Sequence, residues 1–395
     1  MHSRRDFLKW SSLASASVMM PSFLHALGKG GVAPSGKRLV VIQLSGGNDG
    51  LNTFVPFRND DYYRARPGLA IAPNNVIKLT QEQGINPALA PLQKWYDKGW
   101  VQMINGVGYP NPDRSHFRSM DIWHTGSNSD EYWETGWLGR YLDHACEGAP
   151  EPHRMIETEE TLSLAVKGAN IQGLGMRDIK QLQNSSRNQW VRHLAGRESS
   201  GNAELDFMHK VMTETMSSAD YLQEQVGKER LVRDFPQNPL ARQLKLVAEL
   251  MVAGVNTSVF YTSLTGFDTH VRQANQHSQL LKNYAEAVDA FIEVMRKYDL
   301  FKDTLVLTFS EFGRRVAQNA SQGTDHGKAN NLWIVGGNLK KAGIVNDSPD
   351  LVKLDDGDVS LSTDFRSVYA TILDNWLEVD SQQILKRSFG HIDLV

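Results

Sequence analysis

The stretch Val41–Phe57, VIQLSGGNDGLNTFVPF, joins an apolar strand to a polar, glycine-rich turn. The run Arg38–Leu44 contains three β-branched residues, which predicts a strand buried on both faces, as in a parallel sheet. Two glycines then turn the chain and allow its backbone to approach a site closely. Asn48 and Asp49 follow at once, so amide and acidic groups crowd the end of a buried strand.

Strands and helices alternate along the rest of the chain, which predicts an α/β fold. We expect a three-layer sandwich with a mainly parallel central sheet. Residues 167–235 are polar with few strand signals, and we interpret them as an insertion or cap within a domain of residues 31–395. Further strands are expected at Val101–Ile104, Leu162–Val166, Ser258–Ser263, Thr304–Phe309 and Leu332–Val335, and helices at Ser115–Gly126, Asp130–Ala145, Glu204–Glu229, Asn238–Ala253, Gln273–Tyr298 and Thr363–Leu377.

The composition favours an ordinary globular protein. The chain has 395 residues, a formal net charge of −3 and 41% hydrophobic residues, enough for a sizeable core. This charge gives no indication of nucleic-acid binding. Cys146 is the single cysteine, so an internal disulfide and a zinc site built on several thiolates are both excluded. We expect Cys146 to be a small buried residue.

The N-terminus carries an export pattern. It reads SRRDFLKW from Ser3, which matches the twin-arginine signal S-R-R-x-F-L-K. The apolar stretch Leu13–Leu27 is broken by Pro21 and is too short to span a membrane stably. We therefore expect residues 1–30 to be a signal peptide that the twin-arginine translocase recognises. The folded protein would then be periplasmic or extracellular.

Polar residues follow or precede four predicted strands. In open α/β sheets, ligands bind at the carboxyl ends of the strands. Carboxylates packed together resist ionisation unless a cation is present, and Asp, Glu and His without Cys suit Zn²⁺, Mn²⁺, Fe or Mg²⁺. Each motif alone reads as a capped turn or an ion pair, but together they predict a metal site. Its candidate ligands are Asp49, Asp268, His270, Glu311, Asp325 and His326.

A candidate nucleophile lies at the start of a predicted helix. Ser115 in NPDRSHFRSMDIWHTGS would sit at a helix N-terminus, which favours bound anions. Beside a metal, such a serine could attack phosphorus or sulfur. The alternative is that Ser115 or Asp113 is only an N-cap. Arg118 or Arg314 could bind an oxyanion through the planar guanidinium group.

Several of these motifs resemble one bacterial family. VVIQLSGGNDGLNTFVP, RSHFRSMDIWHTG, FDTH, FSEFGRR and TDHGKANNLWIVGG resemble the DUF1501 family (domain of unknown function), which is usually exported by the twin-arginine pathway. That family is similar to the alkaline phosphatase and sulfatase superfamily. The resemblance implies a metal-binding Asp49, a nucleophile at Ser115, an Asp268/His270 pair, and an acidic Glu311 before a late His326.

The chain also departs from the superfamily. Glu311 is followed by Phe312, where the superfamily has histidine, and no C-x-P-x-R segment could supply formylglycine. We expect one or two divalent ions, zinc first, with manganese, magnesium or iron as alternatives. These departures leave it open that the centre binds a single ion or none.

Three functions follow from this reading. The first is a periplasmic, metal-dependent hydrolase of small phosphate or sulfate esters that uses Ser115 as nucleophile. The second is a non-catalytic exported scaffold that works with a neighbouring exported protein through residues 173–201. The third is a redox enzyme with one metal, although LSGGNDG lacks the G-x-G-x-x-G pattern of dinucleotide binding.

Overall fold

The structure is a computed structural model that describes residues 36–146, 150–188, 201–226, 231 and 233–395. Its main sheet has the strand order β11-β5-β10-β9-β1-β8-β6-β7, with β12 paired to β5. The strands are β1 (Arg38–Ser45), β5 (Val101–Gly108), β6 (Met155–Glu157), β7 (Leu174–Gly175), β8 (Val259–Thr265), β9 (Thr304–Phe309), β10 (Asn330–Gly336), β11 (Gly343–Ile344) and β12 (Thr363–Asp364).

The sheet is mainly parallel, as predicted. β1 lies at its centre and pairs in parallel with β8 and with β9. β10 runs antiparallel to both β9 and β5, so β5 points the same way as β1. The carboxyl ends of β1, β5, β8 and β9 therefore meet the amino end of β10 at one edge of the sheet.

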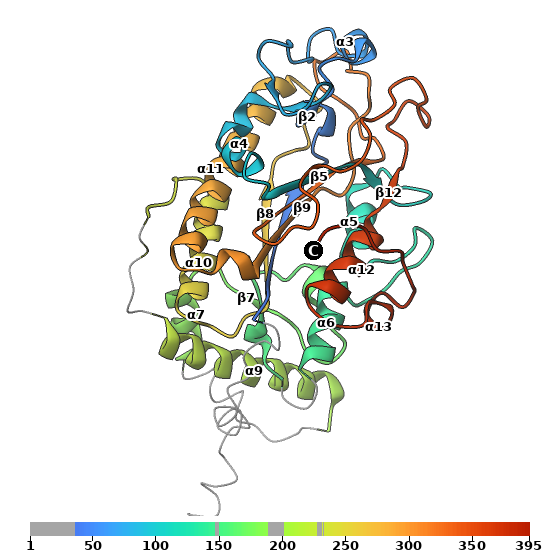
Figure 1. Cartoon of the computed structure of the whole chain (residues 1–395). Helices are drawn as coiled ribbons and strands as arrows, with labels where there is room; N and C mark the ends of the chain where they lie inside the picture. The colour runs from blue at the N-terminus through green and yellow to red at the C-terminus, as the bar shows by residue number, and fades with distance from the viewer. Residues whose placement is uncertain (1–35, 147–149, 189–200, 227–230, 232) are drawn as a thin grey trace, which may run out of the picture.

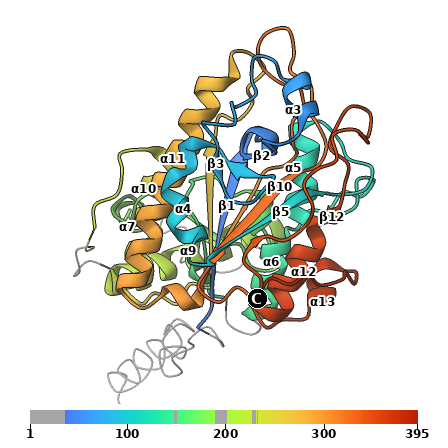
Figure 2. The ribbon, with the colours of Figure 1, turned by 45° about the horizontal axis from the view of Figure 1, so that its top comes forward.

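Helices cover both faces of this sheet, which confirms the three-layer α/β sandwich (Figures 1 and 2). Side chains alternate along β1, so that Val40, Ile42 and Leu44 enter one core while Leu39 and Val41 enter the other. Burying each of these side chains contributes about 1.5–3 kcal/mol. One face carries α4 (Ala90–Tyr96), α10 (Pro239–Val252) and α11 (Gln273–Lys297), and the other carries α5 (His116–Thr125), α6 (Trp137–Ala145), α12 (Phe365–Asn375) and α13 (Ser381–Leu385).

Local signals set the ends of several helices. Asn238 caps α10 by accepting from the amide of Ala241 at 2.8 Å, and Pro239 takes the first helical position. α12 begins after Asp364, which accepts from the Arg366 amide. α5 ends at Thr125 and is capped by Gly126, whose φ of 73° suits glycine. These signals are local, so the predicted bounds agree closely with the observed ones.

Two predicted elements are wrong. Leu162–Val166 was expected to be a strand, but Leu164–Val166 is a short 3-10 helix, and β6 takes the place in the sheet. The main chain after this turn packs on the start of α6, where Lys167 O accepts from Gly136 N at 2.8 Å. Of the predicted helix Asp130–Ala145, only Trp137–Ala145 is helical, because Gly136 is extended and begins it.

The structure adds a small antiparallel sheet that the sequence did not predict. β2 (Phe54–Val55), β4 (Gly84–Ile85) and β3 (Ile77–Lys78) form it next to α3 (Asp60–Ala65). Its strands have two residues each, too short for a periodic signal. The chain enters this sheet at β2, shortly after the glycine turn that follows β1.

Within residues 167–235, β7 extends the edge of the main sheet, and α7 (Ile179–Ser186) and α9 (Ala203–Gln225) follow it. The interpretation of this stretch as an insertion or cap stays a prediction. The signal peptide expected at residues 1–30 lies outside the described residues, as does part of the predicted contact segment 173–201. In the described ranges, every helix is too short or too polar to cross a bilayer.

Candidate metal centre

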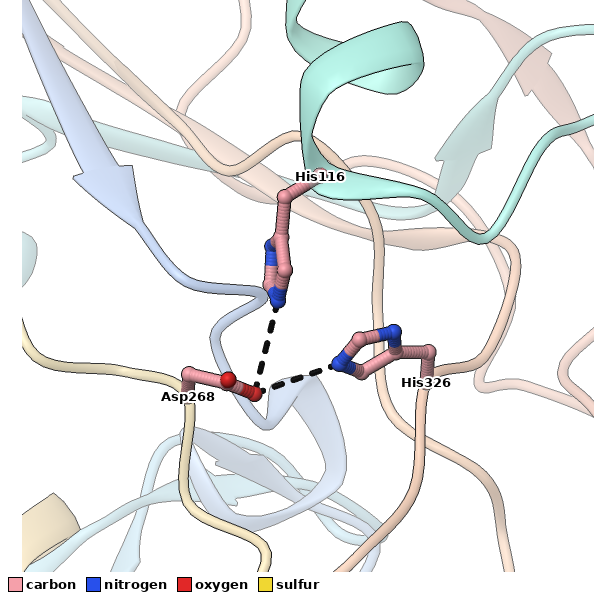
Figure 3. Close-up of side chains that lie close together, drawn as sticks. All are labelled: His116, Asp268 and His326. Carbon is pink, nitrogen blue, oxygen red and sulfur yellow. Dashed lines mark hydrogen bonds and ion pairs between the residues drawn. The ribbon is translucent and has the colours of Figure 1, made fainter.

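Residues from five segments come together at the edge where β1, β5, β8 and β9 end. Gly46 follows β1, His116 opens α5 after β5, Asp268 follows β8, Glu311 follows β9, and His326 precedes β10. Figure 3 shows that His116, Asp268 and His326 point toward one another from three of these segments. The parallel topology therefore places residues from distant parts of the sequence in one cluster.

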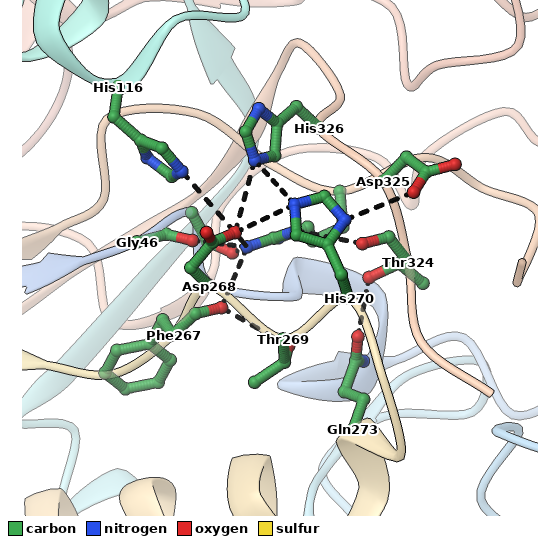
Figure 4. A network of polar contacts seen from close by, with 12 residues as sticks. Gly46, His116, Phe267, Asp268, Thr269, His270, Gln273, Thr324, Asp325 and His326 are labelled. Atoms are coloured by element: carbon green, nitrogen blue, oxygen red, sulfur yellow. Dashed lines mark hydrogen bonds and ion pairs between the residues drawn. The ribbon is translucent and has the colours of Figure 1, made fainter. Parts of the chain in front are cut away.

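The spacing of the cluster suits a divalent cation. One ligand atom from each of His116, Asp268 and His326 lies within 4.8 Å of the others. Asp268 Oδ1 is 3.4 Å from His116 Nε2, 3.2 Å from His326 Nε2 and 3.0 Å from His270 Nε2. The nitrogens of His270 and His326 are 2.9 Å apart (Figure 4). Tetrahedral zinc with bonds of about 2.0–2.1 Å separates its ligand atoms by about 3.3 Å.

Hydrogen bonds at Nδ1 fix the orientation of the imidazoles of His116, His270 and His326. Each Nδ1 faces an oxygen that can only accept, so each Nδ1 donates its proton outward. An imidazole that donates from Nδ1 presents a lone pair at Nε2, as histidines that bind metals do. The pairs are His116 with Glu311 Oε1 at 2.9 Å, His326 with Arg114 O at 2.8 Å, and His270 with Asp325 Oδ1 at 3.2 Å.

The charges of the cluster call for a cation or for extra protons. Three Nε2 lone pairs directed at one carboxylate oxygen repel one another and that oxygen. In the part of the chain that the structure describes, the buried Nε2 of His116 has no hydrogen-bond partner. His116, Asp268 and His326 therefore fit a divalent ion, and the Nε2 of His270 lies 2.9 Å from that of His326.

The pKa shifts follow from these contacts. Its hydrogen bond to Glu311 raises the pKa of His116 and outweighs the effect of burial. Burial lowers the pKa of His326. For Asp268, burial would raise the pKa, but the hydrogen bond from Arg314 and its positive charge oppose this effect, and the pKa is lowered to about 2. Asp268 is therefore a carboxylate at neutral pH.

Arg314, expected as an oxyanion binder, is a buried clamp between loops. Its Nε donates to Gly47 O at 2.6 Å, and its Nη1 donates to Thr324 O at 2.9 Å. Its Nη2 donates to Phe267 O at 2.9 Å and to Asp268 Oδ1 at 2.8 Å. All three nitrogens are engaged and the side chain has no exposed surface, so Arg314 holds Asp268 in place.

Asp49, expected as a metal ligand, forms a buried ion pair. Arg66 Nη1 donates to both of its oxygens, at 2.8 and 2.6 Å, and neither side chain is exposed. Burial would raise the pKa of Asp49, but Arg66 outweighs it and the pKa is lowered. Gln273 donates to the same carboxylate and accepts from Thr324 Oγ1 at 2.6 Å. Asp49 is thus connected to the cluster loops through hydrogen bonds.

Ser115 and Arg118, the remaining candidates for catalysis, have different surroundings. Ser115 is exposed at the N-terminus of α5, and its side chain does not cap this helix. Ser119 N makes the first helical hydrogen bond, to Ser115 O, so the three preceding amides have no acceptor within the helix. Arg118 instead donates to Asn128 O at 3.1 Å and stacks on Tyr132. The described contacts of Arg118 are therefore directed to residues 128–132.

His116 was not among the ligands predicted from the sequence, whereas Glu311 was. In the structure Glu311 accepts from Gly46 N at 2.8 Å and from His116, so it orients the His116 imidazole. The signal for His116 was its position directly after Ser115, at the start of a helix that follows a buried strand. The direction of the His116 side chain depends on the position of β5 in the sheet, which the sequence alone does not provide.

Solved structures with a similar fold have low sequence identity to this chain. A sulfatase from Pseudoalteromonas sp., PsFucS1, has 10% identity and a TM-score of 0.41, with 90% of this chain and 70% of that chain covered. The lipoteichoic acid synthase LtaP from Listeria monocytogenes has 9% identity and a TM-score of 0.39, covering 89% and 75%. A mutant of TAB5 alkaline phosphatase with bound Mg has 9% identity and a TM-score of 0.35, covering 76% and 90%.

No curated protein matches the chain in sequence. A family model described as "Protein of unknown function (DUF1501)" matches residues 95–392, about three quarters of the chain. The matched range contains His116, Asp268 and His326 of the candidate metal site, and Ser115. The chain therefore belongs to the DUF1501 family.

Proposed function

We propose that this chain is an exported, metal-dependent hydrolase of phosphate or sulfate esters. The observation that carries the proposal is the convergence of three imidazoles, each anchored at Nδ1, on the oxygen of Asp268 (Figure 4). Such a set of nitrogens and one carboxylate is typical of zinc sites, and manganese or iron also accept it. The resemblance of the sequence motifs to phosphatases and sulfatases supports the ester substrate.

One ion is the number that these residues support. His116, His326 and Asp268 would supply three ligand atoms, and His270 would supply a fourth. Glu311, Asp49 and Asp325, the other acidic candidates, are engaged by His116, Arg66 and His270 in turn. A divalent ion held here would polarise an oxygen of the ester and lower the pKa of a nearby hydroxyl group.

The residues of the chain have separate roles in this reaction. Ser115 Oγ would form a bond to phosphorus or sulfur while the bond to the ester oxygen breaks and that oxygen takes up a proton. The amides of the first turn of α5 would donate to the developing oxyanion, aided by the helix dipole. Water would then release Ser115 and the inorganic anion. Arg314 would hold the Asp268 carboxylate in position throughout the reaction.

The test combines metal content with turnover. The full chain, exported by a twin-arginine-competent bacterium, is analysed for metals and assayed with 4-nitrophenyl phosphate and 4-nitrophenyl sulfate. We expect about one divalent ion per chain and turnover of one of the two esters. Ser115→Ala should keep the ion and lose at least about 1,000-fold in kcat. Ser388→Ala is the matched control, because Ser388 is exposed far along the sequence from the cluster residues.

Two outcomes would decide against parts of this proposal. Unchanged kcat in Ser115→Ala removes the serine from the mechanism while leaving the metal site. A loaded protein that hydrolyses neither ester, but purifies with another exported protein, favours the scaffold function instead.

A further inference from the structure

A small, partly open cavity of about 90 Å³ shares the residue Glu311 with the His116, Asp268 and His326 cluster. Residues 108–112 form one wall, Lys328, Asp355 and Leu361 contribute to the others, and Glu311 also lines it. Glu311 is the residue whose carboxylate accepts from His116. Glu311 is therefore common to the cavity lining and to the contacts of the cluster.

Its walls continue into the proposed reaction site. Residues 108–112 lead directly to Ser115 at the start of α5, and Lys328 follows His326 by two residues. An ester whose reacting group lies at the cluster would place a small part of its leaving group in this cavity.

The lining combines apolar surface with one cation. Pro110, Pro112 and Leu361 provide apolar surface, and 40% of Leu361 is exposed. The Lys328 side chain is only 18% exposed, and its Nζ lies 2.8 Å from Asp355 Oδ1. Such a lining suits a flat or short apolar group that ends in an anion.

Replacing Asp355 by another carboxylate at Lys328 costs little free energy. The Asp355 side chain is 56% exposed, and ion pairs of this kind contribute little to stability because water solvates the carboxylate well. The turn that carries Asp355 is held in other ways. Asp355 and Asp358 exchange two backbone hydrogen bonds, and the buried Asp358 pairs with Arg114 and Arg315.

We propose that this cavity binds the leaving-group part of the substrate, and that Lys328 selects an aromatic or short apolar group carrying a carboxylate. The carboxylate replaces Asp355 at Lys328 Nζ, and Asp355 turns to water. The substrate class becomes a phosphate or sulfate ester of a carboxylated alcohol or phenol. Only the ester half of this statement rests on the proposed function; the anion site in the cavity stands without it.

The test measures equilibrium binding of benzoate and of its neutral isostere benzamide to the full metal-loaded chain, by calorimetry. Wild-type protein should bind benzoate about tenfold tighter than benzamide, as a charge-assisted hydrogen bond gives. Lys328→Met should remove this preference. Asp355→Asn should increase it about threefold, because the competing charge is lost. Lys302→Met is the control with the same change in net charge, since Lys302 is 60% exposed and belongs to the segment before β9.

A preference for benzoate that survives in Lys328→Met, or equal binding of both ligands to the wild type, overturns the proposal. Hydrolysis of 4-nitrophenyl phosphate and sulfate is measured on the same preparations. Binding that depends on Lys328 without any hydrolysis keeps the cavity site and removes the hydrolase function. Hydrolysis without a preference for benzoate does the reverse.

Discussion

The substitution Asp49→Asn tests whether Asp49 is a metal ligand or the partner of a buried ion pair. The two roles predict different effects on metal binding and on stability. The substitution keeps the shape of the side chain and removes its charge. If Asp49 were a metal ligand, the variant would lose the ion. The structure instead places both carboxylate oxygens on Arg66, with both side chains fully buried. We therefore expect the variant to lose stability and to keep its metal.

The size of the loss follows from the charge that remains. Removing one partner of a buried pair leaves Arg66 uncompensated and costs about 3–5 kcal/mol. Unfolding entropies of about 2.1 cal/mol/K per residue give about 0.8 kcal/mol/K for 395 residues. The melting temperature should therefore fall by about 4–6 °C. Adding Arg66→Met to Asp49→Asn removes the unpaired charge and should restore part of this loss.

The assay is thermal unfolding with and without a chelator. In the wild type, bound metal should raise the melting temperature above that of chelator-treated protein. We expect the same increment in Asp49→Asn, superimposed on the lower baseline. An increment that disappears in Asp49→Asn, with little change in the chelator-treated protein, would refute this reasoning and make Asp49 a ligand.

Two further predictions concern buried groups. Arg314→Lys should weaken metal binding about 10–100-fold, because a lysine cannot hold Asp268 and three loops together; competition with a chromogenic chelator measures this affinity, and an unchanged value contradicts the role of Arg314. Burial raises the pKa of Glu157 from 4.5 to about 7. Because the folded pKa is the higher one, its contribution to stability is complete below about pH 4.5 and is lost as pH rises through about 7, a change of about 3 kcal/mol. Urea unfolding at pH 4.5 and pH 8 should show this change in the wild type and not in Glu157→Gln; identical changes in both proteins contradict it.

The main sheet was predictable because its strands are long and apolar. Thr304–Phe309 was predicted with the observed bounds, since a continuous apolar run between turn signals has few alternative structures. Leu162–Val166 failed because its conformation depends on contact with Gly136 at the start of α6. Sequence periodicity carries no information about such a contact, and tertiary packing overrides the local preference.

The sequence predicted where in the fold the candidate site lies, but not which contacts each of its residues makes. Asp268, His270 and His326 were expected near the ends of strands, and the structure brings their side chains together there. The direction of the His116 side chain and the pairing of Asp49 with Arg66 could not be predicted, because both depend on how the elements pack. Arg66 lies 17 residues after Asp49 in a loop without periodicity, so the sequence gives no sign that it neutralises that carboxylate.

The amount of divalent metal bound by the full chain and by His326→Gln tests the central claim most directly. Elemental analysis of the exported wild-type protein should find about one ion per chain. His326→Gln should bind that ion more than about 100-fold more weakly, since a ligand is lost. His144→Gln, which changes an exposed histidine outside the cluster, should match the wild type. Wild-type protein without a divalent ion, or His326→Gln with undiminished affinity, would contradict the metal centre.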